Sequence, residues 1–358
     1  MKILVYGEYY TESFARHISE NLNLMGHDVL EYSHSYSHSY SHSYGSTRNN
    51  LFKNNKFVKG FKKLKEDLNF SVKTFRTSRN KKFLKFITSQ NPDLIIVCYD
   101  YFWSEEIEQI KKHSKSKIVL WSPDSIATFA AGRSHFMNAS YDALFFKDPF
   151  IVKNMKSILG LEAYYLPECF NPHQHYLSKD KDLAPYYCDL ATAGNLHSYR
   201  VAFFKQLISK GYDIKIWGID SPDWLDKGKI NEIYQGKPVY NQDKAAAFLG
   251  TKIVINNLLL SEIEGVNVRT FEAAGIGAFQ LVDWRLGLED LFLPGKEIET
   301  FKDMNELKEK IDFYLKNETL RNDIADNGKK RAYKDHTYEK RLSLLIDTVF
   351  NQSQGFNF

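Results

Sequence analysis

The sequence contains few cysteines, and their positions match neither a metal site nor a disulfide scaffold. Three cysteines occur among 358 residues, at Cys98, Cys169 and Cys188, and their spacing matches no metal-ligand pattern. An odd number of widely separated cysteines also argues against the disulfide scaffolds that stabilise small secreted domains. We therefore expect reduced thiols and a cytoplasmic protein.

Long apolar runs are missing as well. No stretch of the sequence approaches the ~18 consecutive apolar residues that indicate a membrane-spanning helix. Residues 1–7 form a short apolar run that stops at Gly7 after the length of one strand. This run lacks the longer apolar region and the cleavage site of a secretory signal. The expected protein is soluble, or attached to a membrane only at its surface.

The sequence also lacks a complete dinucleotide-binding fingerprint. Residues 7–9, Gly-Glu-Tyr, end the first expected strand and should border a ligand cleft, but they do not continue into G-x-G-x-x-G. Those glycines allow the backbone to approach the pyrophosphate of a dinucleotide. A dinucleotide-dependent oxidoreductase is therefore disfavoured.

What is present is an alternation of strand-length apolar runs and helical patterns, which is typical of parallel sheets covered by helices. At about 150 residues per domain, the length predicts two domains. Expected strands lie at residues 2–6, 28–32, 93–98, 117–121, 143–146, 163–166, 189–193, 213–217, 252–256 and 279–282. The predicted fold class is α/β, with two Rossmann-like domains.

A polar segment at residues 167–187 separates the two halves and reads as a hinge. We predict an N-terminal domain over residues 1–170 and a C-terminal domain over residues 171–337. Residues 338–358 are predicted to form a terminal helical segment.

The most informative motif is the segment 264–272, Glu-Gly-Val-Asn-Val-Arg-Thr-Phe-Glu, followed by Ala-Ala-Gly-Ile-Gly-Ala and an apolar strand. A glycine-flanked loop that enters a helix offers unpaired backbone N–H groups and a positive dipole end to a phosphate. A carboxylate one or two turns further on can accept hydrogen bonds from the hydroxyls of a ribose. The alternative is a pair of glutamates on an exposed helical face.

This segment resembles the E-x7-E motif of retaining GT-B glycosyltransferases. The later stretches Gly-Lys-Glu-Ile-Glu-Thr-Phe-Lys-Asp and Asp-His-Thr-Tyr-Glu-Lys-Arg are similar to the branch that includes the CgeB-type spore-maturation proteins. The resemblance is specific over residues 189–345 and looser over residues 1–170. It implies two parallel sheets that face each other across a cleft, with the C-terminal helix crossing back to the N-terminal domain.

The resemblance also implies roles for the residues of the motif. Glu272 would bind the ribose hydroxyls and Glu264 the donor sugar, while the amides of Gly265, Val266 and Asn267 would lie near the phosphates. No Asp-x-Asp precedes a strand where it could hold a metal-bound diphosphate. We therefore expect no cofactor and no metal requirement.

A second segment, Gly194-Asn195 with Arg200 six residues after the glycine, follows the strand at 189–193. It resembles the glycine-plus-basic segment that opens the nucleotide domain of these transferases. Because a guanidinium matches two phosphate oxygens, we predict that Arg200 and Arg269 form a split phosphate clamp. For each arginine the alternative is a surface ion pair.

Three further candidates end expected strands. Trp217 and Gly218 fall where the family has its base-binding loop, although a buried core position is the alternative for Trp217. Asp124 falls where related enzymes place a polar residue, often a histidine, that faces the donor sugar. Asp124 is equally suited to cap the helix that would follow it.

Two inserts interrupt the first half. Residues 33–44 repeat Ser-His-Ser-Tyr three times, a low-complexity tract for which a histidine metal site is the less favoured interpretation. Residues 48–85 hold thirteen lysines and arginines against two acidic residues, with large apolar residues interleaved. This pattern fits a basic amphipathic surface that binds anionic lipid or an anionic acceptor, or a helix that covers the sheet and exposes its lysines. Nucleic-acid binding is not expected, since no recognised module accompanies the charge.

These observations favour a retaining, metal-independent hexosyltransferase that moves a sugar from a nucleotide-sugar donor, with UDP preferred, to a glycan or lipid-linked acceptor. We expect it to act in cell-surface polysaccharide or envelope biosynthesis. Two alternatives stay open: a nucleotide-sugar 2-epimerase, which uses the same two-domain fold, and a non-catalytic protein that binds a sugar or nucleotide.

Overall fold

The structure is a computed structural model that describes residues 1–33, 72–125, 135–137, 139–220 and 224–351. By its internal contacts the chain divides into two units. The first comprises Met1–Ser122 and Phe129–Phe145, and the second comprises Pro123–Thr128 and Phe146–Phe358. The repeat beyond Ser33 and residues 48–71 of the basic insert lie outside the described residues.

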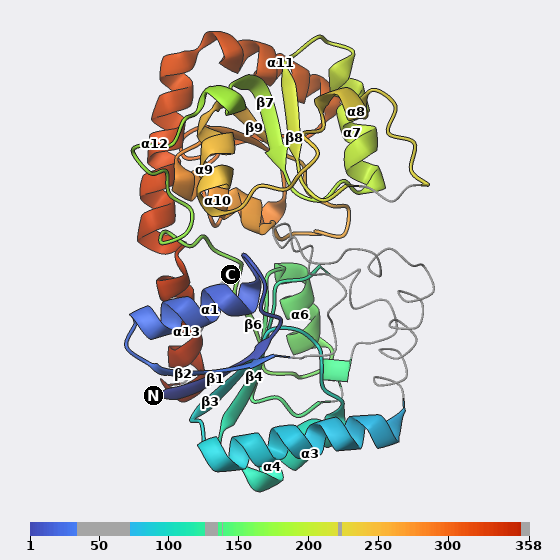
Figure 1. Cartoon of the computed structure of the whole chain (residues 1–358), viewed down its shortest axis with the longest axis vertical. Coiled ribbons are helices and arrows are strands. Elements are labelled where there is room, and N and C mark those ends of the chain that lie inside the picture. The colour runs from blue at the N-terminus through green and yellow to red at the C-terminus, as the bar shows by residue number, and fades with distance from the viewer. Residues whose placement is uncertain (34–71, 126–134, 138, 221–223, 352–358) are drawn as a thin grey trace, which may run out of the picture. The chain divides into compact units, whose positions relative to one another are not determined.

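The first sheet has six strands in the order β2-β1-β3-β4-β5-β6 (Figure 1). Strand β1 pairs in parallel with β2 and β3, and β3 pairs in parallel with β4. The strands are β1 (Lys2–Gly7), β2 (Asp28–Ser33), β3 (Leu94–Val97), β4 (Lys117–Ser122), β5 (Ala143–Phe146) and β6 (Ala163–Tyr165). Strands β3 and β5 are buried along their whole length, as expected of parallel strands covered on both faces.

Four α-helices accompany these strands in the described part of the chain: α1 (Phe14–Leu24), α3 (Lys73–Gln90), α4 (Ser104–His113) and α6 (Pro149–Ser157). A short 3₁₀ turn, η2, spans His135–Met137. Helix α6 begins at Pro149 because the Asp148 side chain caps it, accepting a hydrogen bond from the Phe150 amide at 3.0 Å.

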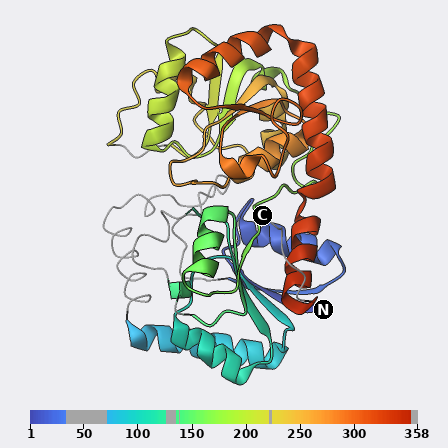
Figure 2. The ribbon, with the colours of Figure 1, turned by 180° about the vertical axis from the view of Figure 1, so that it is seen from behind.

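Helix α3 contains the end of the basic insert, and it lies beside α4 in both views (Figure 1, Figure 2). Phe83 and Ile87 are buried, while Lys81 and Lys82 are exposed. Arg79 is not a surface charge, because its Nη2 lies 2.8 Å from Glu106 Oε1 in a largely buried ion pair. Within its described residues, this helix therefore covers the sheet with its apolar side.

The second sheet has five parallel strands in the order β11-β10-β9-β7-β8. They are β7 (Cys188–Ala193), β8 (Ile214–Trp217), β9 (Thr251–Asn256), β10 (Gln280–Asp283) and β11 (Glu299–Phe301). From β7 the chain leads to β8 on one side and returns to β9 on the other. The sheet therefore has its topological switch point between β7 and β9, where open α/β sheets bind their ligands.

The helices of this part are α7 (Ser198–Ile208), α8 (Ile230–Ile233), α9 (Asn241–Leu249), α10 (Val268–Ile276), α11 (Met304–Lys316), α12 (Glu318–Asp335) and α13 (Tyr338–Asn351), with 3₁₀ turns η3 (Ala184–Tyr186) and η4 (Leu286–Leu288). Alternate residues of the strands enter opposite cores, as the pleat of a strand requires. Leu190 and Ile216 pack in the core formed with α7, α11 and α12. Ala191 and Trp217 pack in the core formed with α9 and α10.

The predicted fold class is confirmed: the chain forms two parallel-sheet α/β arrangements of Rossmann type. The last strand of the first sheet ends at Tyr165 and the first strand of the second sheet begins at Cys188. Among the described residues, no helix combines the length and the apolar character that crossing a membrane requires.

Candidate active site at the carboxyl edge of the second sheet

Two glycines shape the backbone where β7 and β8 end. Gly194 has φ 143° and Gly218 has φ 158°. A Cβ on Gly218 would lie 1.9 Å from the carbonyl oxygen of Gly194, so the two turns touch only because Gly218 lacks a side chain. A Cβ on Gly194 would lie 2.2 Å from Arg269 Nη2 and 3.1 Å from Arg200 Nη1. The structure therefore brings Gly194, Arg200 and Arg269 together, as the sequence predicts.

The two arginines are held by neutral oxygens at this edge. Arg200 donates from Nε to Asn257 Oδ1 at 3.0 Å and from Nη1 to the carbonyl of Asn195. Arg269 donates from Nε to the carbonyl of Ala193 at 2.6 Å and from Nη1 to Asn256 Oδ1 at 3.1 Å. Arg200 is 4% exposed and Arg269 is 6% exposed, so the alternative of a surface ion pair is wrong for both.

Burial makes these two cations electrostatically costly. It lowers the pKa of Arg269 to about 10. Burial also lowers the pKa of Arg200 well below its usual range, and repulsion by Arg269 lowers it further. In the described part of the chain neither guanidinium has a carboxylate within ion-pair distance. Asp283 attracts Arg200 and Glu272 attracts Arg269 only from a longer distance, so this pair of buried cations favours an anionic ligand in direct contact.

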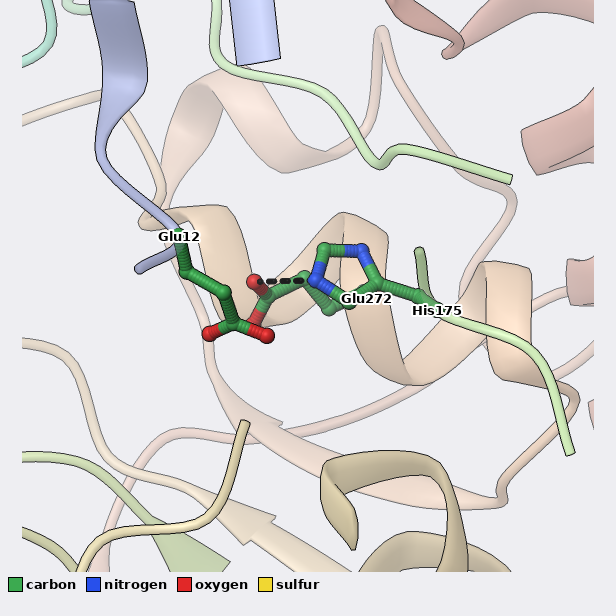
Figure 3. A group of neighbouring side chains, drawn as sticks. All are labelled: Glu12, His175 and Glu272. Atoms are coloured by element: carbon green, nitrogen blue, oxygen red, sulfur yellow. Dashed lines mark ion pairs between the residues drawn. The ribbon is translucent and has the colours of Figure 1, made fainter. Parts of the chain in front are cut away.

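Glu272 projects from α10 into a buried polar cluster. Its Oε1 lies 2.8 Å from Lys244 Nζ on α9 and 3.5 Å from His175 Nε2 (Figure 3). The Asn171 amide donates to His175 Nδ1 at 3.3 Å, which leaves the ring proton on Nε2, facing the carboxylate. Because Glu272 is only 6% exposed, the alternative of an exposed helical face is wrong. The sequence interpretation missed Lys244 and His175, since neither stands in a motif.

Asn267 sets where α10 begins. Its side-chain oxygen accepts a hydrogen bond from the Thr270 amide at 3.2 Å, and its amide nitrogen donates to Asn256 Oδ1 at 3.0 Å. The helix ends at Gly277, which has φ 92°. Val266, directly before Asn267, is fully buried, so its side chain anchors the loop in front of the helix.

The loop that carries Glu264 is fixed by its backbone. Asp148 Oδ2 accepts hydrogen bonds from the amides of Ile263 at 3.0 Å and Glu264 at 3.2 Å. A Cβ on Gly265 would lie 2.5 Å from the carbonyl oxygen of Lys147, so only glycine allows this approach. The Gly287 amide donates to the Glu264 carbonyl at 2.9 Å. The partly exposed Glu264 side chain therefore stands on a rigid backbone.

A buried cluster of charges lies beside this loop. Lys147 Nζ is 2.9 Å from Glu262 Oε1 and 3.4 Å from Glu168 Oε2, and all three side chains are buried. Burial raises the pKa of Glu168 to about 7 against the attraction of Lys147. Burial also raises the pKa of Asp124, which Lys147 opposes and Glu262 reinforces. Asp124 therefore belongs to a group of three carboxyls around one lysine, a grouping that the sequence interpretation did not find.

The other interpretation of Asp124, a helix cap, concerns residues 126–134, which lie outside the described residues. Ser125, which follows Asp124, shares a hydrogen bond of 2.8 Å with Ser261 in the loop before Glu264. The structure thus brings Asp124 into the same neighbourhood as that loop.

The expectation that Trp217 flanks a nucleotide base is not supported. Trp217 is 2% exposed and packs with the core beneath α9 and α10, with its ring centroid 5.8 Å from that of Tyr186. Trp217 is therefore a buried core aromatic, which was the alternative interpretation, because its side chain points from the strand into the core. Gly218, the next residue, keeps its place beside Gly194.

The sequence interpretation gave no role to two polar side chains at the ends of strands. Asn257 follows β9 and is fully buried, and Asp283 ends β10 with 8% exposure. The signal was available, since a polar residue that directly follows an apolar strand at this edge is a candidate for the site.

A cavity of about 500 Å³ opens at the opposite, amino edge of the same sheet, lined by residues that include Cys188, Asp189, Asp213, Thr251 and Arg321. These residues stand where strands begin or on α12. The cavity is therefore separate from the arginines and from Glu272.

Comparison with known proteins agrees with this arrangement. Residues 200–347 match the family model for glycosyl transferase-like proteins. A search of curated proteins finds no match.

The fold matches solved structures over almost the whole chain. Sucrose-phosphate synthase from Thermosynechococcus elongatus has a TM-score of 0.65 and 12% identity, covering 98% of this chain and 100% of that one. A glycosyltransferase from Rickettsia africae has a TM-score of 0.64 and 12% identity, covering 98% and 99%. HepE from Anabaena, solved with UDP-glucose, has a TM-score of 0.67 and 11% identity, covering 98% and 100%. The chain thus has the GT-B fold of glycosyltransferases, and residues 200–347 match a glycosyltransferase family, while its placement in the CgeB-type branch stays a prediction.

Proposed function

We propose that this protein is a retaining glycosyltransferase that transfers a hexose from a nucleotide-sugar donor, with UDP preferred, to a glycan or lipid-linked acceptor. The observation that carries the proposal is the convergence of Arg200 and Arg269 on Gly194, at the switch point of the second sheet. The solved structure of HepE with UDP-glucose supports the choice of donor.

The buried arginines suit the chemistry of donor cleavage. When the bond between the sugar and the diphosphate breaks, negative charge builds on the leaving diphosphate. Fixed cations aimed at those oxygens stabilise the transition state more than the ground state, and so raise the rate of the chemical step. Arg200 and Arg269 are pre-positioned by Asn195, Ala193, Asn256 and Asn257, so little reorganisation is needed when the charge develops.

The remaining residues of the site divide between nucleotide and sugar. Glu272, held by Lys244 and with His175 Nε2 3.5 Å away, would accept hydrogen bonds from the ribose hydroxyls. Glu264 and Asp124 would bind the donor sugar and orient it for attack by the acceptor. The backbone of residues 265–267, just before the N-terminus of α10, would lie near the phosphates, where the helix dipole favours negative charge.

We also propose that the enzyme works without a metal ion, in the cytoplasm, and on an acceptor of the cell surface or envelope. The basic residues 48–85 would bring it to the inner face of the membrane, where a lipid-linked acceptor is available. Because α3 covers the first sheet, the proposed membrane binding rests on the part of the basic insert that precedes this helix.

The test is incubation of the purified protein with a panel of nucleotide sugars, in EDTA and in Mg²⁺, followed by NMR of the sugar products. Slow release of a sugar with the anomeric configuration of the donor supports a retaining transferase. Conversion to a C2 epimer would replace the proposal with the epimerase alternative. Binding of a nucleotide sugar without turnover, with or without candidate acceptors, would replace it with a binding protein.

A further inference from the structure

Asp283, the last residue of β10, carries a buried oxygen without a hydrogen bond. Its carboxylate accepts a hydrogen bond from the Leu258 backbone amide. In the described part of the chain, Oδ1 of Asp283 is shielded from solvent and has no hydrogen-bond partner. Leaving a buried acceptor unsatisfied costs roughly 1–3 kcal/mol, so such an atom calls for a functional explanation.

The groups that face Asp283 are mostly cationic. Arg285 Nη2 lies 3.6 Å from Asp283 Oδ2, and Arg200 on α7 attracts the same carboxylate. Tyr199, also on α7, interacts electrostatically with both Asp283 and Arg285. Burial lowers the pKa of His197, which precedes α7, and the positive charges of Arg200 and Arg269 lower it further. Two guanidinium groups, those of Arg285 and Arg200, therefore act on one carboxylate at the site proposed for the diphosphate, and Arg269 lies beside Arg200.

Asp283 stands where a diphosphate would compete with it for the same cations. Burial raises the pKa of Asp283 to about 6, against the attraction of Arg285 and Arg200. A nucleotide sugar brings two negative charges to Arg200 and Arg269. These charges take over the neutralisation of the arginines and repel an ionised Asp283.

We infer that Asp283 balances the charge of the arginine clamp in the free protein and takes up one proton when the diphosphate of the donor binds. The proton comes from the solvent, and the neutral carboxyl then donates a hydrogen bond from its unpartnered oxygen to a phosphate oxygen. Asp283 is thus a positioning residue for the diphosphate. This inference rests on the proposed function, because it requires a nucleotide-sugar donor.

The sign of the pH dependence follows from linkage. Above pH 6 the free protein holds Asp283 ionised, whereas the complex holds it protonated, so binding takes up a proton. The affinity for the donor therefore falls as pH rises above about 6, by up to tenfold per pH unit. Below pH 6 the proton is already present and this dependence disappears.

The experiment is titration calorimetry with UDP-glucose at pH 7 in buffers of different ionisation enthalpy, which counts the protons exchanged. Both phosphates of UDP-glucose are esterified, so neither titrates near neutral pH and any proton taken up enters the protein. We expect the wild type to take up about one proton per complex. Asp283→Asn is expected to take up none, and its Kd is expected to stay constant between pH 6 and 8.

Asp323→Asn is the matched control, because Asp323 is an exposed aspartate on α12 and should leave the wild-type uptake unchanged. If the wild type binds UDP-glucose without taking up a proton, the inference is overturned. This outcome is measured on the wild type, so it does not depend on how well the variant folds. Uptake that persists in a folded Asp283→Asn protein overturns it as well. Failure of every nucleotide sugar to bind the wild type contradicts the proposed function itself, which separates the two failures.

Discussion

Lys244 Nζ lies 2.8 Å from Glu272 Oε1, in a pair that is buried on both sides. The carboxylate proposed for the ribose is thus held by a lysine from the neighbouring helix, α9. A buried ion pair of this kind fixes the direction of the carboxylate, and each partner depends on the other to offset its desolvation. Two predictions concern this pair.

Replacing Glu272 by alanine should abolish the stabilisation that a nucleotide diphosphate gives the protein in the absence of metal. A carboxylate on the ribose contributes to ground state and transition state alike, so its loss appears in affinity. Thermal-shift titration with UDP measures the effect, with Glu309→Ala on the exposed side of α11 as the control. A shift of wild-type size in Glu272→Ala would remove Glu272 from the nucleotide site.

Replacing Lys244 by methionine should destabilise the fold by about 3–5 kcal/mol, because Glu272 is left as a buried charge without its lysine. The double variant Lys244→Met/Glu272→Gln should recover much of that stability but should not bind nucleotide. Urea unfolding of the two single variants and the double variant gives the coupling energy. Additive changes in the free energy of unfolding would show that the pair is not coupled.

Replacing Glu264 or Asp124 by alanine should lower turnover by roughly a hundredfold or more while leaving most nucleotide affinity in place. The reason is that both residues are assigned to the sugar, whereas the nucleotide is held by the arginines and Glu272. Donor hydrolysis under saturating conditions measures kcat, and the thermal shift with UDP serves as the internal control. If either variant turns over donor at the native rate, that residue has no catalytic role.

Replacing Arg200 or Arg269 by lysine should lower kcat/KM by roughly a hundredfold or more, although the charge is kept. Lysine cannot reproduce the two parallel hydrogen bonds of a guanidinium, nor reach both the backbone carbonyl and the asparagine that hold each arginine. Steady-state kinetics with the active donor check this, with Arg16→Lys on the exposed side of α1 as the control. Kinetics close to wild type in both variants would argue against the clamp.

Changing Lys59, Lys62, Lys63 and Lys65 to glutamine should weaken binding to anionic vesicles. Each basic residue near an anionic bilayer contributes up to about 1 kcal/mol, and screening by salt reduces this contribution. Co-sedimentation with neutral and anionic vesicles at low and physiological salt measures it. Four exposed lysines elsewhere, Lys329, Lys330, Lys334 and Lys340, provide a quadruple control of equal charge. Equal recovery with neutral and anionic vesicles would assign residues 48–85 to a solvated surface.

The sequence alone predicted the features that depend only on residues close together along the chain. The period of apolar runs predicted the two parallel sheets, and Gly265 predicted a loop in front of a short helix, which the structure has. The spacing of Glu264 and Glu272 placed one in a loop and the other in the helix that follows. Each of these signals is local, because it depends on strand period, helix period or the lack of a Cβ.

The tertiary structure alone decided which charges meet. Lys244 joins Glu272 across 28 positions and Lys147 joins Glu262 across 115, and no sequence pattern links residues so far apart. It also decided that Trp217 is a core residue, because the direction of a side chain at the end of a strand depends on how helices cover that face. The electrostatics followed from burial: the shifts at Arg200, Glu168 and Asp283 arise because folding removes water around them, and a sequence does not record how much water each residue loses.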